Sequence, residues 1–498
     1  MSIVTVFTAL AIAACFCDLA HSAASKPHIL FIAADDLGWN DVGFHGSEIH
    51  TPNLDKLAME GVIMNRTYVQ PLCSPTRSTF MSSRFPIHTG LQHSVIRPTQ
   101  PYGLPLNITT IAQHLKSVGY STHIIGKWHL GFCNAQYTPI ERGFDTHFGY
   151  YVGAEDYFTH RRADAVPNNS SDPTAFSVHV DGLDFRNNTQ VVKNMNGTYS
   201  TIAFAMEAQR IVSQHNPDEP LYLYLPFQAV HGPLEAPQRF IDMYSHIKDE
   251  KRRTFAGMVT AMDEAIGNIT AAFQKRGLWE NTLMIFTTDN GGPVTVGANN
   301  YPLRGSKATV WEGGTRGSVF VHGNMLEKKG YTNNELVHSV DWYPTLLTAA
   351  GLPVTTLDID GIDMWDTITK GSASKREEFV YNIDTNVPIA AIRYQQWKLI
   401  VGETGAHSGW YPQPTVSASL TDNQSLKVEN TTTYLFDLDA DPTEHFNLVK
   451  EKPEIVSMMK KRLEEIMKTY VHDLSTLHPP TAKCNPANFG DAWGPGWC

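Results

Sequence analysis

Two short, unbroken apolar segments constrain the fold most strongly. Residues 28–34 and 282–287 lack the polar alternation of a strand with one face in water. Such runs are typical of parallel strands that are covered on both faces. A helix is predicted over residues 51–61, which carry threonine before the first turn, proline within it and glycine at the end. Further helices are predicted at 109–118 and 253–275, and further strands at 122–125 and 221–225. Strands alternating with helices predict an α/β fold with a large, mixed, mostly parallel sheet flanked by helices.

The pattern changes after about residue 370. A Gly/Ser-rich stretch at 371–375 resembles a linker, and an amphipathic helix is predicted over 454–470. Short strands are predicted at 379–382, 390–393, 397–401 and 434–437. We therefore expect a large domain over residues 25–372 and a smaller α+β domain over 373–498, with an antiparallel sheet and one helix.

The first 24 residues have the pattern of a secretory signal peptide, an apolar stretch followed by small residues. No later segment reaches the roughly 20 apolar residues that a membrane helix needs, so no membrane span is expected. Sites of the form Asn-x-Ser/Thr support a secretory route, to the lysosome or out of the cell. These candidate glycosylation sites are Asn65, Asn107, Asn168, Asn169, Asn187, Asn196, Asn268, Asn423 and Asn430.

Four cysteines remain once the signal segment is removed: Cys73, Cys133, Cys484 and Cys498. Four cysteines in a chain of this length do not build a disulfide scaffold. Cys484 and Cys498 are close together in a Pro/Gly-rich tail and could pair, although spacing alone does not fix the connectivity.

The net charge excludes a polyanion held by broad electrostatic attraction. The 39 Lys and Arg residues are outnumbered by 50 Asp and Glu, which gives a formal charge of -11. Nucleic-acid binding requires a basic surplus or a dense basic patch, and the chain has neither. An anionic substrate would have to be held by a few side chains in one pocket.

Carboxylates follow two of the buried strands directly. Asp35 and Asp36 come after the first, and Asp289 and Asn290 after the strand at 282–287. In open α/β sheets, functional groups gather at the carboxyl ends of strands. Oxygen donors without thiolate or imidazole beside them suit Ca²⁺ or Mg²⁺. Taken singly, each pair could equally cap a turn.

Several nucleophilic and cationic residues also stand near predicted strand or helix ends. Pro75 is placed to start a helix, which puts Cys73 at its N-terminal end, where an anion is favoured, with Arg77 on the same face. Lys127 and His129 are two apart on a segment expected to be extended, so both would point into one cavity. Cys73 could equally be a buried inert thiol. His231 and Lys307 are further candidates, each more often structural when seen alone.

Together these segments resemble the sulfatase family. The run Cys73-Ser-Pro-Thr-Arg77 resembles one signature of that family, and the segment from Gly119 through Gly131 resembles another. Within the family, residues 141–145, 302–305, 311–314 and 493–497 look like the arylsulfatase B group, the N-acetylgalactosamine-4-sulfatases. The resemblance runs from about residue 27 to the C-terminus and implies an alkaline-phosphatase-like fold.

The resemblance also implies a set of roles. Cys73 would be converted to Cα-formylglycine by the formylglycine-generating enzyme and act, hydrated, as the nucleophile. Arg77 and His129 would hold this group. One Ca²⁺ would be bound by Asp35, Asp36, Asp289, Asn290 and residue 73. The sulfate group would be bound by Lys127, His231 and Lys307. His231 would also protonate the leaving oxygen.

Three functions are compatible with these residues. The main hypothesis is hydrolysis of sulfate esters, above all the 4-sulfate of N-acetylgalactosamine in dermatan or chondroitin sulfate. A related arylsulfatase acting on small or dietary sulfate esters is the enzymatic alternative. A phosphodiesterase or phosphonate hydrolase of the wider superfamily fits less well, because the full sulfatase signatures are present. An unmodified protein that only binds sulfated glycans is the alternative from another class, and it would need neither His129 nor the metal carboxylates.

Overall fold

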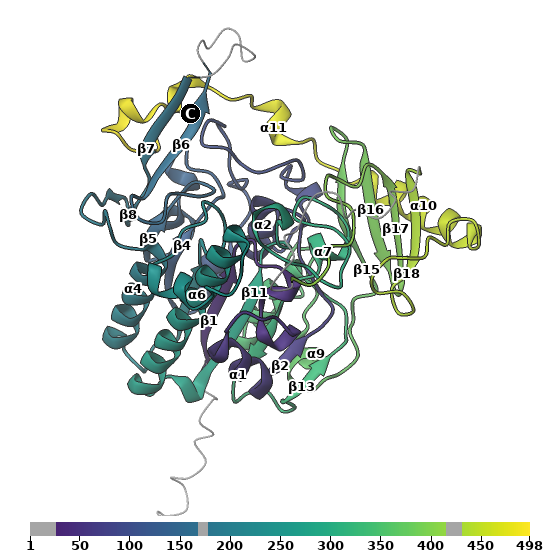
Figure 1. The fold of residues 1–498 in the computed structure, drawn as a ribbon, viewed down its shortest axis with the longest axis horizontal. Coiled ribbons are helices and arrows are strands. Elements are labelled where there is room, and N and C mark those ends of the chain that lie inside the picture. Colours follow the sequence, from purple (N-terminus) through teal and green to yellow (C-terminus); the bar gives the residue numbers. More distant parts are fainter. Residues whose placement is uncertain (1–25, 168–177, 415–430) are drawn as a thin grey trace, which may run out of the picture.

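A ten-stranded sheet forms the centre of the larger part of the molecule (Figure 1). The computed structural model describes residues 26–167, 178–414 and 431–498. The strand order is β13-β2-β12-β11-β1-β10-β4-β5-β8-β9. Their bounds are β1 His28–Ala34, β2 Val62–Met64, β4 Ser121–Lys127, β5 Thr146–Tyr150, β8 Arg186–Asn187, β9 Gln190–Val191, β10 Leu221–Pro226, β11 Thr282–Thr288, β12 Phe320–His322 and β13 Tyr331–Asn333.

The central strands are parallel and buried, as the apolar runs predict. β1 pairs in parallel with β10 on one side and β11 on the other, and all residues of these three strands are buried. β4 and β5 continue the parallel order, whereas β12 and β8 pair antiparallel to their neighbours. The prediction of a mixed, mostly parallel sheet is confirmed.

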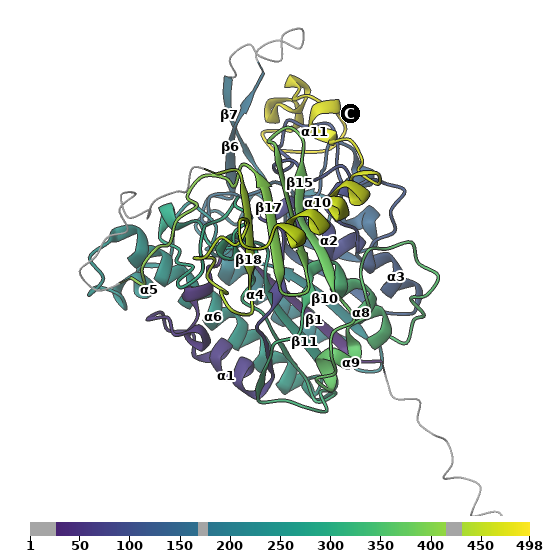
Figure 2. The same ribbon diagram turned by 90° about the vertical axis from the view of Figure 1, so that its right-hand side faces the viewer.

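Helices cover both faces of this sheet (Figure 2). One group contains α1 Pro52–Glu60, α4 Ser200–Gln214, α5 Gln238–Asp242 and α6 Glu250–Arg276, which contact one another through α6. The group on the other face contains α2 Cys73–Ser82, α3 Ile111–Ser117, α8 Trp342–Ala349 and α9 Trp365–Thr369. The predicted helices at 51–61, 109–118 and 253–275 correspond to α1, α3 and α6. The two helical layers exclude water from both faces of the central strands.

The C-terminal part forms its own four-stranded antiparallel sheet. It contains β15 Glu378–Asp384, β16 Ile389–Tyr394, β17 Trp397–Gly402 and β18 Thr433–Asp437, in that order. Its side chains alternate between two faces: Leu399 and Leu435 face α10 Pro453–Met467, whereas Ile400 and Tyr434 pack with Trp311 of the larger part. The predicted antiparallel sheet and single amphipathic helix are confirmed, and the sheet has a second apolar face against the larger part.

The tail after α10 returns to the larger part of the molecule. Backbone N–H groups of Val471 and Leu474, the latter opening α11 Leu474–Leu477, donate to the carbonyls of Ile87 and Gly90 at 2.8 and 2.9 Å. The tail then pairs beside the hairpin of β6 Arg161–Val166 and β7 Val178–Leu183, where the Trp493 N–H donates to the Leu183 carbonyl at 2.9 Å. Residues far apart in sequence are thereby held side by side.

The cysteine pairing differs from the expected one. Cys498 is bonded to Cys133, 365 residues away, and Cys484 is a buried free thiol. The prediction of a Cys484–Cys498 bond is therefore wrong. The reason is the path of the tail: the N–H groups of Gly496 and Trp497 both donate to the Cys133 carbonyl, at 2.7 and 3.1 Å, and so bring Cys498 to it.

Only some of the candidate glycosylation sites lie within the described residues. The signal peptide at 1–24 lies outside the described residues, as do Asn168, Asn169, Asn423 and Asn430. Asn65 is half-buried, and the exposed candidate glycosylation sites are Asn107, Asn187, Asn196 and Asn268. Glycosylation at these sites stays a prediction. Among the described residues, no helix is both long and apolar enough to span a membrane.

Candidate active site

The predicted acidic residues meet at the ends of two adjacent strands. Because Ala34 of β1 pairs with Thr288 of β11, the next residues on each strand are neighbours. The Asp36 N–H donates to Oδ1 of Asp289 at 3.3 Å, and Nδ2 of Asn290 donates to Oδ1 of Asp36 at 2.7 Å. All four predicted oxygen donors, Asp35, Asp36, Asp289 and Asn290, are buried. The strand pairing thus brings together residues that lie more than 250 positions apart.

Cys73 is the first residue of α2, as the position of Pro75 predicts. Its thiol is buried, and burial raises its pKa to about 11 against the partly opposing effect of Lys127 and Lys307. Thr76, on the first turn of α2, donates through its hydroxyl to the Leu72 carbonyl at 3.1 Å and also to the Asp289 carbonyl. An unmodified Cys73 would be a protonated thiol, which is a poor nucleophile. Thr76 thereby ties the start of α2 to the backbone of Asp289.

Arg77 and Lys127 place two basic side chains behind these carboxylates. The Arg77 guanidinium donates twice to Oδ2 of Asp289, at 3.0 and 2.7 Å, and lies 3.4 Å from Asp35. Nζ of Lys127, at the end of β4, lies 2.5 Å from Oδ2 of Asp35. Both cations have no exposed side-chain surface. They are therefore held in place by charge pairing within the protein and face no competing water.

His129 reaches the site by a route that the sequence analysis did not anticipate. β4 ends at Lys127, and His129 has a left-handed φ of 58°, so the expectation of an extended segment through His129 is wrong. Its Nε2 lies 3.0 Å from the Ile96 carbonyl oxygen, while Nδ1 is buried without a hydrogen-bond partner among the described residues. Burial, with Lys127 and Arg77 nearby, holds the pKa of His129 well below its usual range. The turn leaves one ring nitrogen available to a bound group.

His231 and Lys307 stand on the accessible side. His231 follows β10, and the segment before it is tied to β1, because the Val230 N–H donates to the Asp35 carbonyl at 2.6 Å. Nε2 of His231 lies 3.6 Å from Oδ2 of Asp36, and Nζ of Lys307 lies 2.6 Å from Oδ1 of the same residue. Their side chains are 24% and 16% exposed. A substrate arriving from solvent would meet these two residues first.

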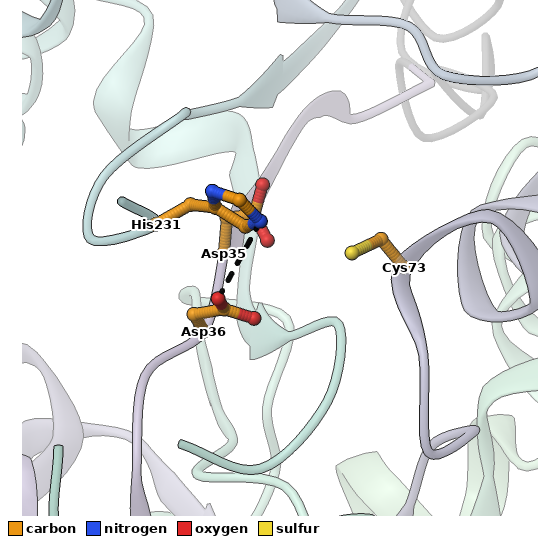
Figure 3. A group of neighbouring side chains, drawn as sticks. All are labelled: Asp35, Asp36, Cys73 and His231. Atoms are coloured by element: carbon orange, nitrogen blue, oxygen red, sulfur yellow. Dashed lines mark ion pairs between the residues drawn. The ribbon is translucent and has the colours of Figure 1, made fainter. Parts of the chain in front are cut away.

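Four side chains form a candidate metal site (Figure 3). Ligating atoms of Asp35, Asp36, Cys73 and His231 all lie within 4.8 Å of one another. Oδ1 of Asp35 and Oδ1 of Asn290 are buried without a hydrogen-bond partner among the described residues. Buried polar atoms of this kind cost free energy unless a ligand satisfies them. The set itself offers two carboxylates, one thiol and one imidazole, and the oxygens of Asp289 and Asn290 lie beside it. With these two residues included, oxygen donors prevail, which fits the predicted Ca²⁺. His231 is an addition to the ligands that the sequence predicts.

The charges of the site are balanced before any ligand binds. Three carboxylates, of Asp35, Asp36 and Asp289, face three basic side chains, Arg77, Lys127 and Lys307. Burial raises the pKa of Asp35 and of Asp36, but the surrounding cations outweigh this effect and leave both below their usual range. Burial and the charge of Asp35 raise the pKa of Asp289. A divalent cation would make the site net positive, which suits an anionic substrate.

Two supporting residues were missed by the sequence analysis. The Ser74 hydroxyl donates to the His129 carbonyl at 3.0 Å and accepts from the Ile96 N–H at 3.1 Å. The Tyr157 hydroxyl donates to the His231 carbonyl at 2.8 Å. Ser74 could have been suspected from its place beside Cys73, whereas nothing in the sequence connects Tyr157 with His231.

Comparison with known proteins gives matches over most of the chain. The family model described as Sulfatase matches residues 27–352, and the one described as the C-terminal region of aryl-sulfatase matches residues 374–498. The chain is 44% identical to arylsulfatase J of Mus musculus, over 95% of this chain and 80% of that protein. It is 28% identical to N-acetylgalactosamine-6-sulfatase of Homo sapiens, over 96% and 92%. The crystal structure of Ps i-CgsB in complex with k-i-k-neocarrahexaose superposes with a TM-score of 0.75 at 29% identity, covering 90% of this chain and 94% of that one.

Proposed function

The chain belongs to the sulfatase family and is a sulfuric ester hydrolase of the arylsulfatase type, and from that premise we propose that it removes sulfate from sulfated sugars with residue 73 as formylglycine and one bound Ca²⁺. The observation that carries the proposal is the convergence of Cys73, three carboxylates and three cations at the ends of β1, β4 and β11. A hydrated formylglycine supplies a nucleophile that can release sulfate by collapsing to the aldehyde, and Ca²⁺ supplies positive charge to the sulfate oxygens.

The residues of the chain then have separate tasks. Lys127 and Lys307 hold the sulfate oxygens and stabilise the charge that develops during transfer. Arg77 fixes Asp35 and Asp289, and with them the metal site. His129 offers its unpartnered Nδ1 as the base next to residue 73. His231, on the accessible side, donates the proton to the leaving oxygen.

For the substrate, we propose the 4-sulfate of N-acetylgalactosamine in dermatan or chondroitin sulfate. The motifs at 141–145, 302–305, 311–314 and 493–497 support it through their likeness to the arylsulfatase B group. Two proteins similar to this chain carry sugar names, one an N-acetylgalactosamine-6-sulfatase and one a structure with a neocarrahexaose. The enzymatic alternative, a small aryl or dietary sulfate ester, is supported by the similarity to arylsulfatase J.

We further propose that maturation occurs in the secretory pathway. The Cys133–Cys498 disulfide fits an oxidising compartment. The formylglycine-generating enzyme would act there on Cys73, and the mature enzyme would reach the lysosome or the extracellular space. The catalytic domain would span residues 25–372 and the smaller domain residues 373–498.

Mass spectrometry of residue 73 tests the central step. Trypsin releases Thr67 to Arg77 as one peptide from protein made in eukaryotic cells. We expect the mass of formylglycine at position 73, and turnover of an aryl sulfate by the same preparation. An ordinary thiol throughout, together with sulfated-glycan binding, would instead identify a non-catalytic binder. Desulfation of 4-sulfated, 6-sulfated and aryl substrates in parallel then decides the substrate class.

A further inference from the structure

The loop that carries Lys307 is attached to the site on one side and to the C-terminal sheet on the other. Toward the site, the Lys307 N–H donates to the Gly292 carbonyl at 3.3 Å and the Ala308 N–H to the Pro71 carbonyl at 2.8 Å. These acceptors lie two residues from Asn290 and Cys73 respectively. The two ends of the loop, Arg304 and Glu312, are held by residues from beyond position 372.

The first end of the loop, Arg304, is held by residues 408–410 of the C-terminal part. The guanidinium carbon of Arg304 lies over two indole rings, 3.5 Å from the ring centroid of Trp311 and 4.3 Å from that of Trp410. Its Nε donates to the Ser408 carbonyl at 2.9 Å, and the Gly305 N–H donates to the Gly409 carbonyl at 2.8 Å. The two cation–π contacts and these hydrogen bonds restrict the orientation of the arginine.

The second end of the loop, Glu312, is held by a buried lysine that it shares with Glu444. Lys398 of β17 has no exposed side-chain surface, and its Nζ lies 3.0 Å from Oε1 of Glu312 and 2.7 Å from Oε1 of Glu444. The Tyr68 hydroxyl donates to Oε2 of Glu312 at 2.7 Å, and the Glu312 N–H donates to Oε2 of Glu444 at 2.8 Å. Across the neck of the loop, the Gly313 N–H donates to the Arg304 carbonyl at 2.7 Å.

We propose that Trp410 and Lys398 are positioning residues for Lys307, acting through Arg304 and Glu312 at the two ends of its loop. The proposal rests on the role of Lys307 given under Proposed function. A lysine has a flexible stem, so the place of its ammonium group depends on where its backbone is held. A displacement of about 1 Å can cost roughly 100-fold in rate. The C-terminal part thereby helps to position a catalytic residue, although it contains none of the proposed catalytic residues.

A double-mutant cycle between Trp410 and Lys307 tests the proposal. We compare Trp410→Ala, Lys307→Ala and the double variant with the wild type, using 4-nitrophenyl sulfate and measuring kcat and KM separately. Trp410→Ala should lower kcat/KM by roughly 10- to 100-fold, and Trp410→Phe, which keeps a ring over Arg304, should restore most of it. In the Lys307→Ala background, Trp410→Ala should lower kcat/KM by less than about twofold, because the group that it positions is already gone.

Trp279→Ala is the matched control. Trp410 is half-buried and stacks on His445, and Trp279 is likewise half-buried and stacks on His322. Trp279, however, precedes β11 and so lies at the end of that strand opposite Asp289. It should leave kcat/KM within about twofold of the wild type while costing similar stability. Formylglycine content and thermal unfolding are measured on every variant, so that loss of folded or modified enzyme is separated from loss of positioning.

The cycle separates the two proposals. If Trp410→Ala lowers kcat/KM equally in both backgrounds, or not at all, the positioning role is overturned and the role of Lys307 stands. If Lys307→Ala is as active as the wild type, the assigned role of Lys307 is wrong and the positioning proposal falls with it. Lys398→Met, assayed in the same cycle below its unfolding temperature, must show the same dependence on Lys307.

Discussion

Two buried ionic clusters of this molecule contain the same kinds of side chain but are satisfied differently. The site cluster comprises Asp35, Asp36, Asp289, Arg77, Lys127 and Lys307. The interface cluster comprises Glu312, Glu444 and Lys398, with Tyr68 and Tyr381. Beside the site cluster, buried atoms of Asp35, Asn290 and His129 have no partner among the described residues, and Lys307 is partly exposed.

In the interface cluster the carboxylates are paired internally. Both oxygens of Glu312 accept hydrogen bonds and Oε2 of Glu444 accepts another, whereas Oε1 of Glu444 makes no hydrogen bond among the described residues but lies 2.7 Å from Nζ of Lys398. Every carboxylate oxygen of the interface cluster thus has a hydrogen-bond or ion-pair partner, which indicates a joint between two parts of the chain. In the site cluster, Oδ1 of Asp35 has neither kind of partner among the described residues, which indicates a place for a ligand.

Substitution within the site cluster should separate activity from stability. Asp36→Asn removes a predicted metal ligand and the partner of Lys307, so kcat/KM should fall by roughly 10³-fold. The unfolding free energy without Ca²⁺ should change by less than about 1 kcal/mol, because water can reach the freed Lys307. Steady-state kinetics and urea unfolding check this. A variant that keeps its turnover, or one that fails to fold, would contradict the assignment of Asp36.

A large loss of stability is expected for the interface cluster, in addition to the loss of activity expected from its contact with the Lys307 loop. Lys398→Met leaves two carboxylates without their shared cation in a fully buried place, which should lower the unfolding free energy by about 3–5 kcal/mol. Adding Glu312→Gln should recover part of this loss, since one unpaired charge is then removed. Denaturant unfolding measures both values. Equal stability of Lys398→Met and the wild type would show that this cluster does not join the two parts.

Much of this arrangement could be predicted from the sequence. The apolar runs at 28–34 and 282–287 fixed the expectation of buried parallel strands, and their ends predicted that Asp35 and Asp289 converge. The sequence identifies Lys307 and Lys127 by type and position, but it does not identify their carboxylate partners, Asp36 and Asp35. Which side chains meet depends on strand order, and strand order is a property of the whole sheet.

The errors have local physical causes. The sequence around His129 lacked any signal for a left-handed residue outside glycine, so a turn was mistaken for an extended segment. Closeness in sequence makes Cys484 the candidate partner of Cys498, whereas the tail runs back to Cys133. The interface cluster was missed entirely, because Glu312, Lys398 and Glu444 belong to three separate segments that meet only in the folded chain.

Calcium should stabilise the protein through the site cluster alone. A ligand that binds only the folded state at 100 times its Kd adds about 2.7 kcal/mol to the unfolding free energy. Thermal unfolding of the wild type with EDTA and with added Ca²⁺ should show this shift, and Asp36→Asn should abolish it. Glu444→Gln, in the interface cluster, serves as the control that keeps it. A Ca²⁺ shift that survives in Asp36→Asn would place the ion elsewhere.

The smallest expected effect, taken per pH unit, is a pH dependence of stability that arises in the interface cluster. Burial raises the pKa of Glu444 from 4.5 to about 7. The charge of Glu312 adds to this rise, whereas Lys398 opposes it. Arg304 contacts the backbone of Glu444, whose carbonyl accepts from it at 3.3 Å. The folded state therefore holds this proton more tightly than the unfolded state. Stability from this group is fully present below about pH 4.5 and is lost as pH rises through about 7, by at most about 1.4 kcal/mol per pH unit.

Glu444→Gln tests this sign, because the amide cannot titrate. Urea unfolding of the wild type and of Glu444→Gln at several pH values from 5 to 8, all in EDTA, should give a shallower decline for the variant. Any contribution of the site cluster to the pH dependence cancels in this comparison, because its carboxylates are the same in both proteins. If the two curves are parallel, Glu444 does not exchange its proton on folding, and Lys398 then balances two ionised carboxylates rather than one.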